Sequence, residues 1–313
     1  MNTKEQGKTA FVFSGQGSQT LGMGKQLYEQ CPRYRAVLDE ADAIALQPLS
    51  QWMFEEAARL ESTAFVQPMI FAMQAGILSE LEAAGVAVDG ACGLSLGEYA
   101  ALYERGVFTF EEGLRTLIHR GYFMDAATTE EPTGMVALIG PTEQLDALLS
   151  TFPSCYAANY NLPTQTVIGG PTDPLATLIE AAPEYGFKRA LRLPTAGAFH
   201  TRYMADAAKQ FSQYLAPHDW QAPRPDLYLN TTGTRYDGVE PLTALMVRQI
   251  VAPTHFHTMI TAMVEDGYDR FVEIGPGKAL TSMIKKIDRS LSVYAIETPE
   301  ELEQAVAILR SEL

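Results

Sequence analysis

The feature that most constrains this chain is the stretch GLSLGEYAAL at residues 93–102, where Ser95 stands between two glycines in a G-x-S-x-G pattern. The run of small residues GACGL precedes the serine, and apolar residues at helical spacing follow it. A strand that turns at once into a helix has room only for small neighbours, and the middle serine adopts a strained backbone conformation. The pattern therefore predicts a nucleophile elbow, although glycine and serine are common enough for a chance match.

Segments with strand and helix character alternate around this turn. Short β-rich apolar runs predict strands, and longer runs with a regular apolar side predict helices. In the first part of the chain we expect strands at 9–13 and 90–94 and helices at 33–45, 66–85, 97–106 and 110–127. Strands that alternate with helices are typical of a parallel sheet covered by helices. The predicted fold class is therefore α/β.

The stretch 130–196 has a different order. It begins with the polar linker EEPTG and then reads strand, helix, strand, strand, helix, strand. This β-α-β-β-α-β order is that of a ferredoxin-like unit. The first pattern resumes after it, with strands expected at 226–230, 269–275 and 292–297 between helices. We therefore expect one discontinuous domain, 1–129 and 197–313, with a small inserted subdomain at 130–196.

Composition narrows the function classes. The chain of 313 residues has a formal net charge of −15, whereas a nucleic-acid site needs clustered Lys and Arg, so nucleic acid is not an expected partner. Cys31, Cys92 and Cys155 are far apart, which fits neither a metal site nor a disulfide framework. The N-terminal residues lack a signal-peptide core, and no apolar run reaches the roughly 18 residues of a membrane helix. We expect a cytoplasmic protein with no metal, no cofactor and no membrane partner.

A serine nucleophile needs a base, and His200 is the best candidate among the five histidines. It stands in LPTAGAFHTRYM, a loop that follows a predicted strand, and α/β proteins place catalytic groups in such loops. A buried histidine with a purely structural role is the alternative. The other four, His119, His218, His255 and His257, lie in helical or polar segments.

Two glycine-rich loops resemble nucleotide-binding motifs and fail as such. FSGQGSQ at 13–19 lacks the third glycine of a dinucleotide fingerprint, and EIGPGKAL at 273–280 has Ala279 where a phosphate loop needs Ser or Thr. The first loop can instead bring backbone N–H groups close to a ligand. An oxyanion hole next to Ser95 needs two such donors, and the candidates are the N–H groups of Gln16 and Leu96.

Taken together, these motifs resemble those of the malonyl-CoA:acyl carrier protein transacylases, which load fatty acid and polyketide synthesis. The resemblance covers nearly the whole chain and is carried, in order, by FVFSGQGSQ, QP at 67–68, GLSLGEYAAL, RGYFM, AFH, VRQ and EIGPGKAL. It implies an α/β-hydrolase-like domain with an inserted ferredoxin-like subdomain, in agreement with the pattern above. It also implies malonyl-CoA and acyl carrier protein as partners.

The resemblance assigns a role to each matching residue. Ser95 is the nucleophile, His200 the base, and Gln16 and Leu96 the oxyanion donors. Arg120 would clamp the malonyl carboxylate, whereas the sequence alone favours an arginine that snorkels from the face of an apolar helix. The backbone carbonyl of Gln249 would orient the imidazole, so that no third acid is required. The list is completed by two pocket residues, Gln67 and Phe199.

Leu94 departs from the family, because many members have histidine at this position. That histidine is not the general base, so the implied mechanism survives the change. Phe199 agrees with the A-F-H pattern of malonyl-selective members, and its ring would crowd a branched α-carbon.

The resemblance implies a ping-pong transfer through a malonyl ester on Ser95. One alternative is an acyl-thioester hydrolase, against which Arg120 argues because uncharged acyl groups need no carboxylate clamp. Others are a trans-acting acyltransferase of a polyketide pathway and a docking protein without activity. An acidic carrier needs a basic patch, and the candidates are Lys285 and Lys286 with Arg289, and Lys188 with Arg189. Each patch alone is explained as readily by solvated surface charge.

Overall fold

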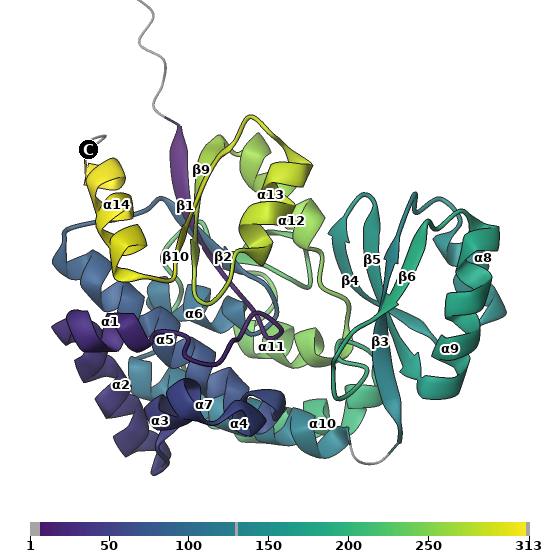
Figure 1. Cartoon of the computed structure of the whole chain (residues 1–313), viewed down its shortest axis with the longest axis horizontal. Helices are drawn as coiled ribbons and strands as arrows, with labels where there is room; N and C mark the ends of the chain where they lie inside the picture. The colour runs from purple at the N-terminus through teal and green to yellow at the C-terminus, as the bar shows by residue number, and fades with distance from the viewer. Residues whose placement is uncertain (1–6, 129–130, 311–313) are drawn as a thin grey trace, which may run out of the picture.

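Two separate sheets organise the chain in the computed structural model, which describes residues 7–128 and 131–310 (Figure 1). The larger sheet has the strand order β10-β9-β1-β2, and all its neighbouring strands are parallel. Its strands are β1 (Lys8–Phe13), β2 (Gly90–Gly93), β9 (Tyr268–Ile274) and β10 (Ser292–Ile296). The predicted α/β class with a parallel sheet is confirmed.

Successive residues of β1 belong alternately to two apolar cores, which explains why helices cover both faces of this sheet. Phe11 and Phe13 belong to the main apolar core, whereas Ala10 and Val12 belong to a second core on the other face. Successive strand residues point to opposite faces, so a strand that is apolar throughout has to be covered on both. The second core is completed by α12 and α13, and the main core by α5 and the helices around it.

Seven helices precede the second sheet in the described residues. Three of them, α1, α3 and α4, were not predicted from the sequence. The bounds are α1 (Lys25–Gln30), α2 (Pro32–Ala45), α3 (Leu49–Glu55), α4 (Ala57–Glu61), α5 (Thr63–Ala83), α6 (Gly97–Glu104) and α7 (Phe110–Ala127). After the second sheet come η2 (Arg202–Met204), α10 (Ala205–Leu215), α11 (Leu242–Val251), α12 (Phe256–Glu265), α13 (Ala279–Ile287) and α14 (Pro299–Arg310).

Helix α5 is long and apolar enough to cross a membrane, contrary to the expectation that no run in the chain would be. Its most apolar window is 78% buried inside the protein, and its neighbours are α2 and α7. Its apolar character is therefore explained by burial on all sides in the core of the fold.

The second sheet contains β3 (Thr133–Ile139), β4 (Tyr156–Leu162), β5 (Gln165–Pro171) and β6 (Arg189–Arg192), in the order β4-β5-β3-β6 with every pair antiparallel. Helices α8 (Leu145–Thr151) and α9 (Thr172–Ala181), the latter followed by η1 (Ala182–Tyr185), cover the face turned away from the parallel sheet (Figure 1). This is the ferredoxin-like arrangement expected from the element order. The domain limits at 129/130 and 196/197 remain predictions, and the first of them lies outside the described residues.

One predicted strand is shorter than expected. The segment 226–230 contains only β7 (Tyr228–Leu229), which pairs with β8 (Thr234–Arg235), and a single bridge joins Leu227 to Ala91 of β2. At the end of the segment, the side chain of Asn230 donates to the backbone oxygen of Gly93 and to Glu98. This short segment still matters, since it brings Asn230 beside the G-x-S-x-G turn.

Candidate active site

Ser95 lies at the end of β2, in the turn that leads into α6. Its φ of 54° places it in the left-handed region, which is strained for a residue with a side chain. A Cβ on Gly93 would lie 2.2 Å from the backbone of Gly97, and a Cβ on Gly97 would lie 2.1 Å from the carbonyl oxygen of Phe13. Both glycines of the pattern are therefore needed for the turn, and the nucleophile elbow is confirmed as a structure.

His200 lies beside this serine although 105 residues separate them in the chain. Its Nε2 is 2.7 Å from Ser95 Oγ, and its Nδ1 is 2.7 Å from the backbone oxygen of Gln249. A carbonyl only accepts, so Nδ1 carries the hydrogen and the neutral ring presents the Nε2 lone pair to the serine hydroxyl. Burial, and next the positive charge of Arg120, lower the pKa of His200 to about 4, which keeps the ring neutral near pH 7.

Arg120 is fully buried on α7, which excludes the snorkelling arginine that the sequence alone favoured. Its guanidinium donates to Gln67 Oε1 at 2.7 Å and to Gln249 Oε1 at 2.9 Å, and one nitrogen lies 3.4 Å from Ser95 Oγ. The Nε–H has no partner within the described ranges. The side chains around the guanidinium, which are the two amides, the Ser95 hydroxyl and the Tyr99 phenol, are uncharged, so the buried cation still lacks an anion in contact with it.

The guanidinium is held from two sides by residues that the resemblance assigned to the site. Gln67 lies on α5 and Gln249 on α11, and both are fully buried. Besides its contact with Arg120, Gln67 donates weakly to Gln16 Oε1, at 3.5 Å. The tyrosine ring of Tyr99 faces the guanidinium at 5.1 Å. These contacts fix the cation beside the serine hydroxyl.

The two expected oxyanion donors belong to segments in direct contact. A Cβ on Gly15, the residue before Gln16, would lie 2.4 Å from the carbonyl oxygen of Leu94, so the glycine-rich loop touches the elbow. Among the backbone hydrogen bonds of the described residues, the N–H groups of Gln16 and Leu96 have no acceptor. Leu96 also stands at the N-terminus of α6, where the helix dipole favours negative charge.

Two residues of this site were missed by the sequence reasoning, Glu98 and Asn230. Asn230 accepts the backbone N–H of Ser95 at 2.8 Å and donates to the backbone oxygen of Gly93 at 2.6 Å. Glu98 accepts from Asn230 and from Gln249, and it is 1% exposed. The available signal was a charged residue among the small and apolar residues that open α6.

The other candidates lie outside this network. Phe199 is buried in the main core next to His200, and its role in selecting the acyl group remains a prediction. Leu94 is half-buried against the second apolar core. Three of the remaining histidines pack against aromatic rings, His119 and His218 beside Tyr214 and His255 on Tyr160.

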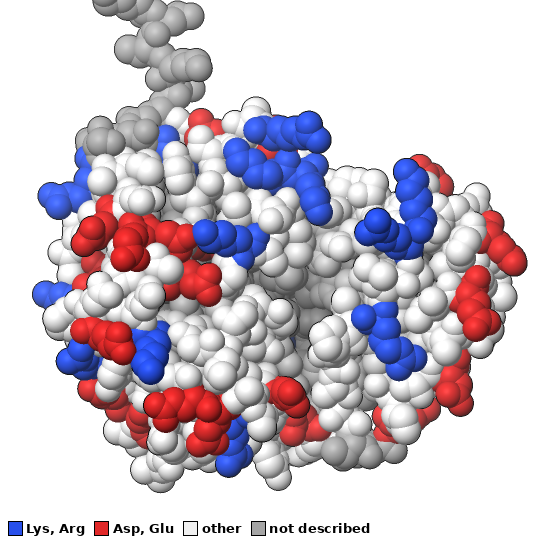
Figure 2. Space-filling model, in the orientation of Figure 1, with Lys and Arg blue, Asp and Glu red and all other residues white. Residues whose placement is uncertain are grey.

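A cleft of about 520 Å³ opens on the His200 side of the site, beside strand β4 of the antiparallel sheet. Figure 2 shows the hollow between the two lobes of the molecule. The cleft is lined by the segment from His200 to Arg202, by residues on β4 and before it, and by the chain after α11. Tyr156 and Tyr160 are among these β4 residues. Because His200 is among the lining residues, the cleft reaches the imidazole beside Ser95.

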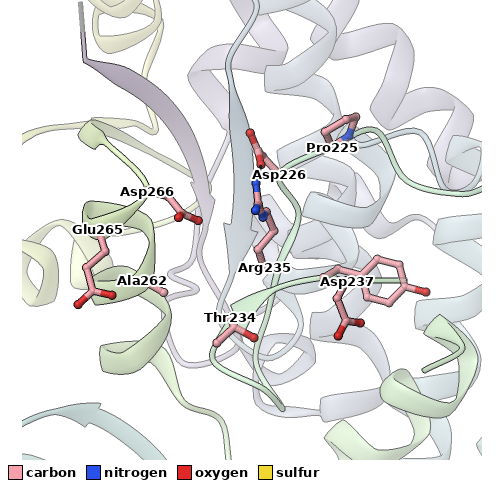
Figure 3. Close-up of a pocket in the computed structure, with 9 residues that line it drawn as sticks. Pro225, Asp226, Thr234, Arg235, Asp237, Ala262, Glu265 and Asp266 are labelled. Carbon is pink, nitrogen blue, oxygen red and sulfur yellow. Dashed lines mark hydrogen bonds and ion pairs between the residues drawn. The ribbon is translucent and has the colours of Figure 1, made fainter. Parts of the chain in front are cut away.

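A second hollow of about 560 Å³ lies elsewhere and contains none of the predicted site residues. Acidic side chains dominate it, and its single arginine, Arg235, is paired with Asp226 at 3.0 Å (Figure 3). The chemistry described above therefore belongs to the cleft beside His200.

The acyl transferase domain family matches residues 10–305. The chain belongs to this family. A curated acyl transferase from Bacillus subtilis (strain 168), named malonyl CoA-acyl carrier protein transacylase, is 33% identical and aligns over 97% of this chain and 98% of its own length.

Solved acyl transferase structures agree with this chain over almost their whole length. The malonyl CoA-acyl carrier protein transacylase from Clostridium perfringens superposes with a TM-score of 0.92 at 34% identity, covering 97% of this chain and 98% of its own. A malonyl-transacylase solved in complex with its type II PKS acyl-carrier protein also reaches a TM-score of 0.92, at 29% identity over 96% of this chain and 99% of its own. Like these relatives, the chain is an acyltransferase.

Proposed function

We propose that this acyltransferase moves a malonyl group from malonyl-CoA to the phosphopantetheine thiol of an acyl carrier protein, through an ester on Ser95. The observation that carries the proposal is the buried cation of Arg120, 3.4 Å from the hydroxyl that would carry the acyl group and without an anion in contact with it. An acyl group with a free carboxylate supplies that anion. Relatives named for malonyl transfer to a carrier protein support the same substrate pair.

The first half-reaction begins with the Ser95–His200 pair. Ser95 Oγ attacks the thioester carbon as its proton passes to His200 Nε2, which lies 2.7 Å away. The carbonyl oxygen becomes an oxyanion that the N–H groups of Gln16 and Leu96 receive. When the oxyanion collapses, the carbon–sulfur bond breaks, the proton on His200 goes to the CoA sulfur, and the malonyl ester remains on Ser95.

The second half-reaction reverses these roles with a new thiol. The carrier thiol gives its proton to His200 and its sulfur attacks the ester carbon. The same N–H groups stabilise the second oxyanion. As the ester bond breaks, Ser95 Oγ recovers the proton from His200. The Gln249 carbonyl holds the imidazole in one tautomer through both steps, the task that a carboxylate performs in a catalytic triad.

Arg120 would set the acyl specificity by binding the malonyl carboxylate. Its guanidinium presents a planar fork that suits a carboxylate and that lysine cannot reproduce. With an acetyl group the buried cation would stay unpaired, at a cost of several kcal/mol, on the order of that of breaking a buried ion pair.

Two other functions on the same scaffold are distinguishable by their products. A thioester hydrolase acting on malonyl-CoA would release free malonate. A hydrolase for uncharged acyl groups would gain nothing from Arg120, because its substrates have no carboxylate to bind. A polyketide-pathway acyltransferase would use the same chemistry with another carrier, and one relative was solved with such a carrier. We place the enzyme in the cytoplasm, where its proposed substrates are made.

The carrier would approach over positive surface beside the cleft. Figure 2 shows Lys and Arg side chains over α13, above the hollow, and on the lobe of the antiparallel sheet. Lys285 and Lys286 lie on α13, whereas Lys188 and Arg189 lie at the start of β6, the edge strand opposite the cleft-lining β4, and all four are exposed. Such a rim offsets the net charge of −15, which by itself repels an acidic partner.

Incubation with malonyl-, methylmalonyl- and acetyl-CoA, each with and without a holo carrier protein, tests the proposal. We expect a malonyl adduct on Ser95 by mass spectrometry, and malonyl carrier as the main product once the carrier is added. Release of free malonate at the rate of carrier loading would favour the hydrolase, and the absence of any adduct would refute the transfer.

A further inference from the structure

The buried carboxylate of Glu98 has no part in the chemistry proposed above. It lies on the first turn of α6, three residues after the nucleophile, and is 1% exposed. An ionised carboxylate only accepts hydrogen bonds, and its burial is costly unless several donors surround it. The donors that surround Glu98 indicate what it does.

Two residues donate to this carboxylate, and both also hold reacting groups. Glu98 Oε1 accepts from Gln249 Nε2 at 2.7 Å. Glu98 Oε2 accepts from the backbone N–H of Asn230 at 2.6 Å and from Asn230 Nδ2 at 2.7 Å. The carboxylate thus draws the NH₂ end of each side-chain amide toward itself, and the oxygen end of each amide has to point away.

For Asn230 this orientation supports the elbow. Its Oδ1 accepts the backbone N–H of Ser95 at 2.8 Å, and its Nδ2 also donates to Gly93 at 2.6 Å. The strained serine is therefore fixed through its own main chain.

For Gln249 the same orientation supports the cation. Its Oε1 accepts from Arg120 at 2.9 Å, while its Nε2 also donates to the backbone oxygen of Ser95 at 3.1 Å. An amide turned over would direct its N–H groups at the guanidinium, which has only donors. Arg120 keeps this acceptor only while the group at position 98 is itself an acceptor.

We propose that Glu98 is a positioning residue: its acceptor-only carboxylate fixes the Gln249 amide and thereby holds Arg120 in the pose that receives the substrate carboxylate. The inference rests on the proposed function, because preference for malonyl over acetyl groups is its readout. A neutral group that brings a donor to position 98 turns the Gln249 amide over and releases the guanidinium.

Protonation of Glu98 brings such a donor. Burial raises the pKa of Glu98 to about 7, although the hydrogen bonds from Asn230 and the charge of Arg120 oppose the rise. Besides Arg120 on α7, the titratable groups that interact with it are Cys92 on β2 and Tyr99 on its own helix, and burial raises the pKa of both. Malonyl preference is therefore expected to fall as the pH drops through about 7.

Glu98→Gln tests the proposal, with Glu273→Gln as its matched control. Glu273 is also fully buried, and it accepts the N–H groups of Leu280 and Thr281 at the start of α13, away from Ser95. For Glu98→Gln we expect kcat/KM for malonyl-CoA to fall about tenfold or more, the effect of one lost hydrogen bond to a charged group. Acetyl-CoA should be affected less, so the malonyl-to-acetyl ratio falls. The control should keep the wild-type ratio.

An unchanged ratio in folded Glu98→Gln, with a malonyl-selective wild type, overturns the inference and leaves the proposed function standing. A wild type without malonyl selectivity overturns the proposed function instead. If Glu98→Gln does not fold, the ratio is measured in the wild type and in Glu273→Gln from about pH 8 to about pH 6. The substrate carboxylate stays ionised over this range. A fall toward low pH in both proteins supports the inference, and a constant ratio overturns it.

Discussion

The parallel and the antiparallel sheets are both built from apolar strands, yet strain and buried charge gather around only one of them. Among the described residues, the non-glycine residues with positive φ are Leu46, Ser95, His200 and Asp226, and none lies between 131 and 196. The buried charged side chains likewise lie outside that stretch. Such features cost on the order of 1–3 kcal/mol each, and they persist where surrounding structure enforces them. Of these residues, Ser95 and His200 with positive φ and the buried Glu98 and Arg120 meet at the candidate site.

The antiparallel sheet nevertheless supports the site, because it holds the loop that carries His200. Ala198 donates its N–H to Thr133 on β3 at 3.0 Å, and a Cβ on Gly169 of β5 would lie 2.9 Å from Thr201. The chain after α11 is bonded to β4 as well, through Thr254 and Tyr160 at 2.8 Å. The parallel sheet thus carries the strained turn of the proposed nucleophile, and the antiparallel sheet, whose non-glycine residues all have negative φ, places the proposed base. The comparison predicts that substitutions at the elbow change chemistry, whereas those inside the antiparallel sheet change stability.

The largest effect is expected from Ser95→Ala. Loss of the nucleophile should lower kcat by about 10⁴-fold or more, as the removal of a catalytic serine does elsewhere. The variant should fold, because alanine is smaller and the turn is fixed by its glycines. Incubation with malonyl-CoA followed by mass spectrometry checks the prediction, and an adduct on this variant would remove Ser95 from its proposed role.

Arg120→Ala is expected to have the next largest effect, on selectivity. Malonyl transfer should fall and acetyl transfer should gain relative to it, changing the ratio of their kcat/KM values by about 10³-fold or more, in the range of a site that loses its polar partner. Arg105→Ala is the matched control, since this arginine is 4% exposed but donates to the backbone oxygens of Asp89 and Pro225. A malonyl-to-acetyl ratio unchanged in Arg120→Ala would contradict the carboxylate clamp.

The fold and the residues that meet at the candidate site were largely predictable because their signals are local. The glycines around Ser95 mark a turn that excludes side chains, and the strand–helix order marks both sheets. His200 followed from its place in a loop after a strand. The burial of Arg120 was harder to predict. A single arginine on an apolar helix gives the same sequence pattern whether its guanidinium reaches solvent or an internal cavity. Only the packing of α5 and α11 against α7 shows that it is enclosed.

Glu98 and Asn230 were not predictable for a related reason. A glutamate in the first turn of a helix is favoured by the helix dipole, so the sequence pattern has an ordinary explanation. Asn230 follows a segment that reads as a strand and carries no motif. Their importance comes from a contact across 132 residues of chain, which no local pattern records. Helices α1, α3 and α4 were missed because they are short and depend on tertiary packing.

Inside the antiparallel sheet, Leu138→Ala should separate stability from chemistry. Leu138 is fully buried in the apolar core beneath α8 and α9, so its truncation should cost about 2–5 kcal/mol of unfolding free energy. The folded fraction should keep the wild-type malonyl-to-acetyl ratio. Gly97→Ala provides the contrast, because its new methyl group meets the backbone of β1 and should reduce both stability and activity. Denaturant unfolding and steady-state kinetics on both variants test this separation.

The smallest effect concerns the pH dependence of stability, in which His200 and Glu98 act in opposite directions. The pKa of His200 is lowered from 6.5 to about 4, so between these values the unfolded chain binds more protons and stability falls as the pH falls. The pKa of Glu98 is raised from 4.5 to about 7, so in that interval the folded chain binds more protons and stability rises as the pH falls. The two contributions offset each other in the wild type between about pH 4.5 and 6.5.

Single variants should separate the two contributions. In His200→Gln the contribution of Glu98 remains, and stability should rise more toward low pH than in the wild type. In Glu98→Gln the contribution of His200 remains, and stability should fall more. Each slope differs from the wild type by at most about 1.4 kcal/mol per pH unit, the value for one proton. Denaturant midpoints measured from about pH 4.5 to about pH 6.5 would show the two variants diverging. Parallel curves would mean that folding shifts neither the pKa of His200 nor that of Glu98. Leu138→Ala should lower the whole curve without changing its slope, because neither leucine nor alanine binds or releases a proton.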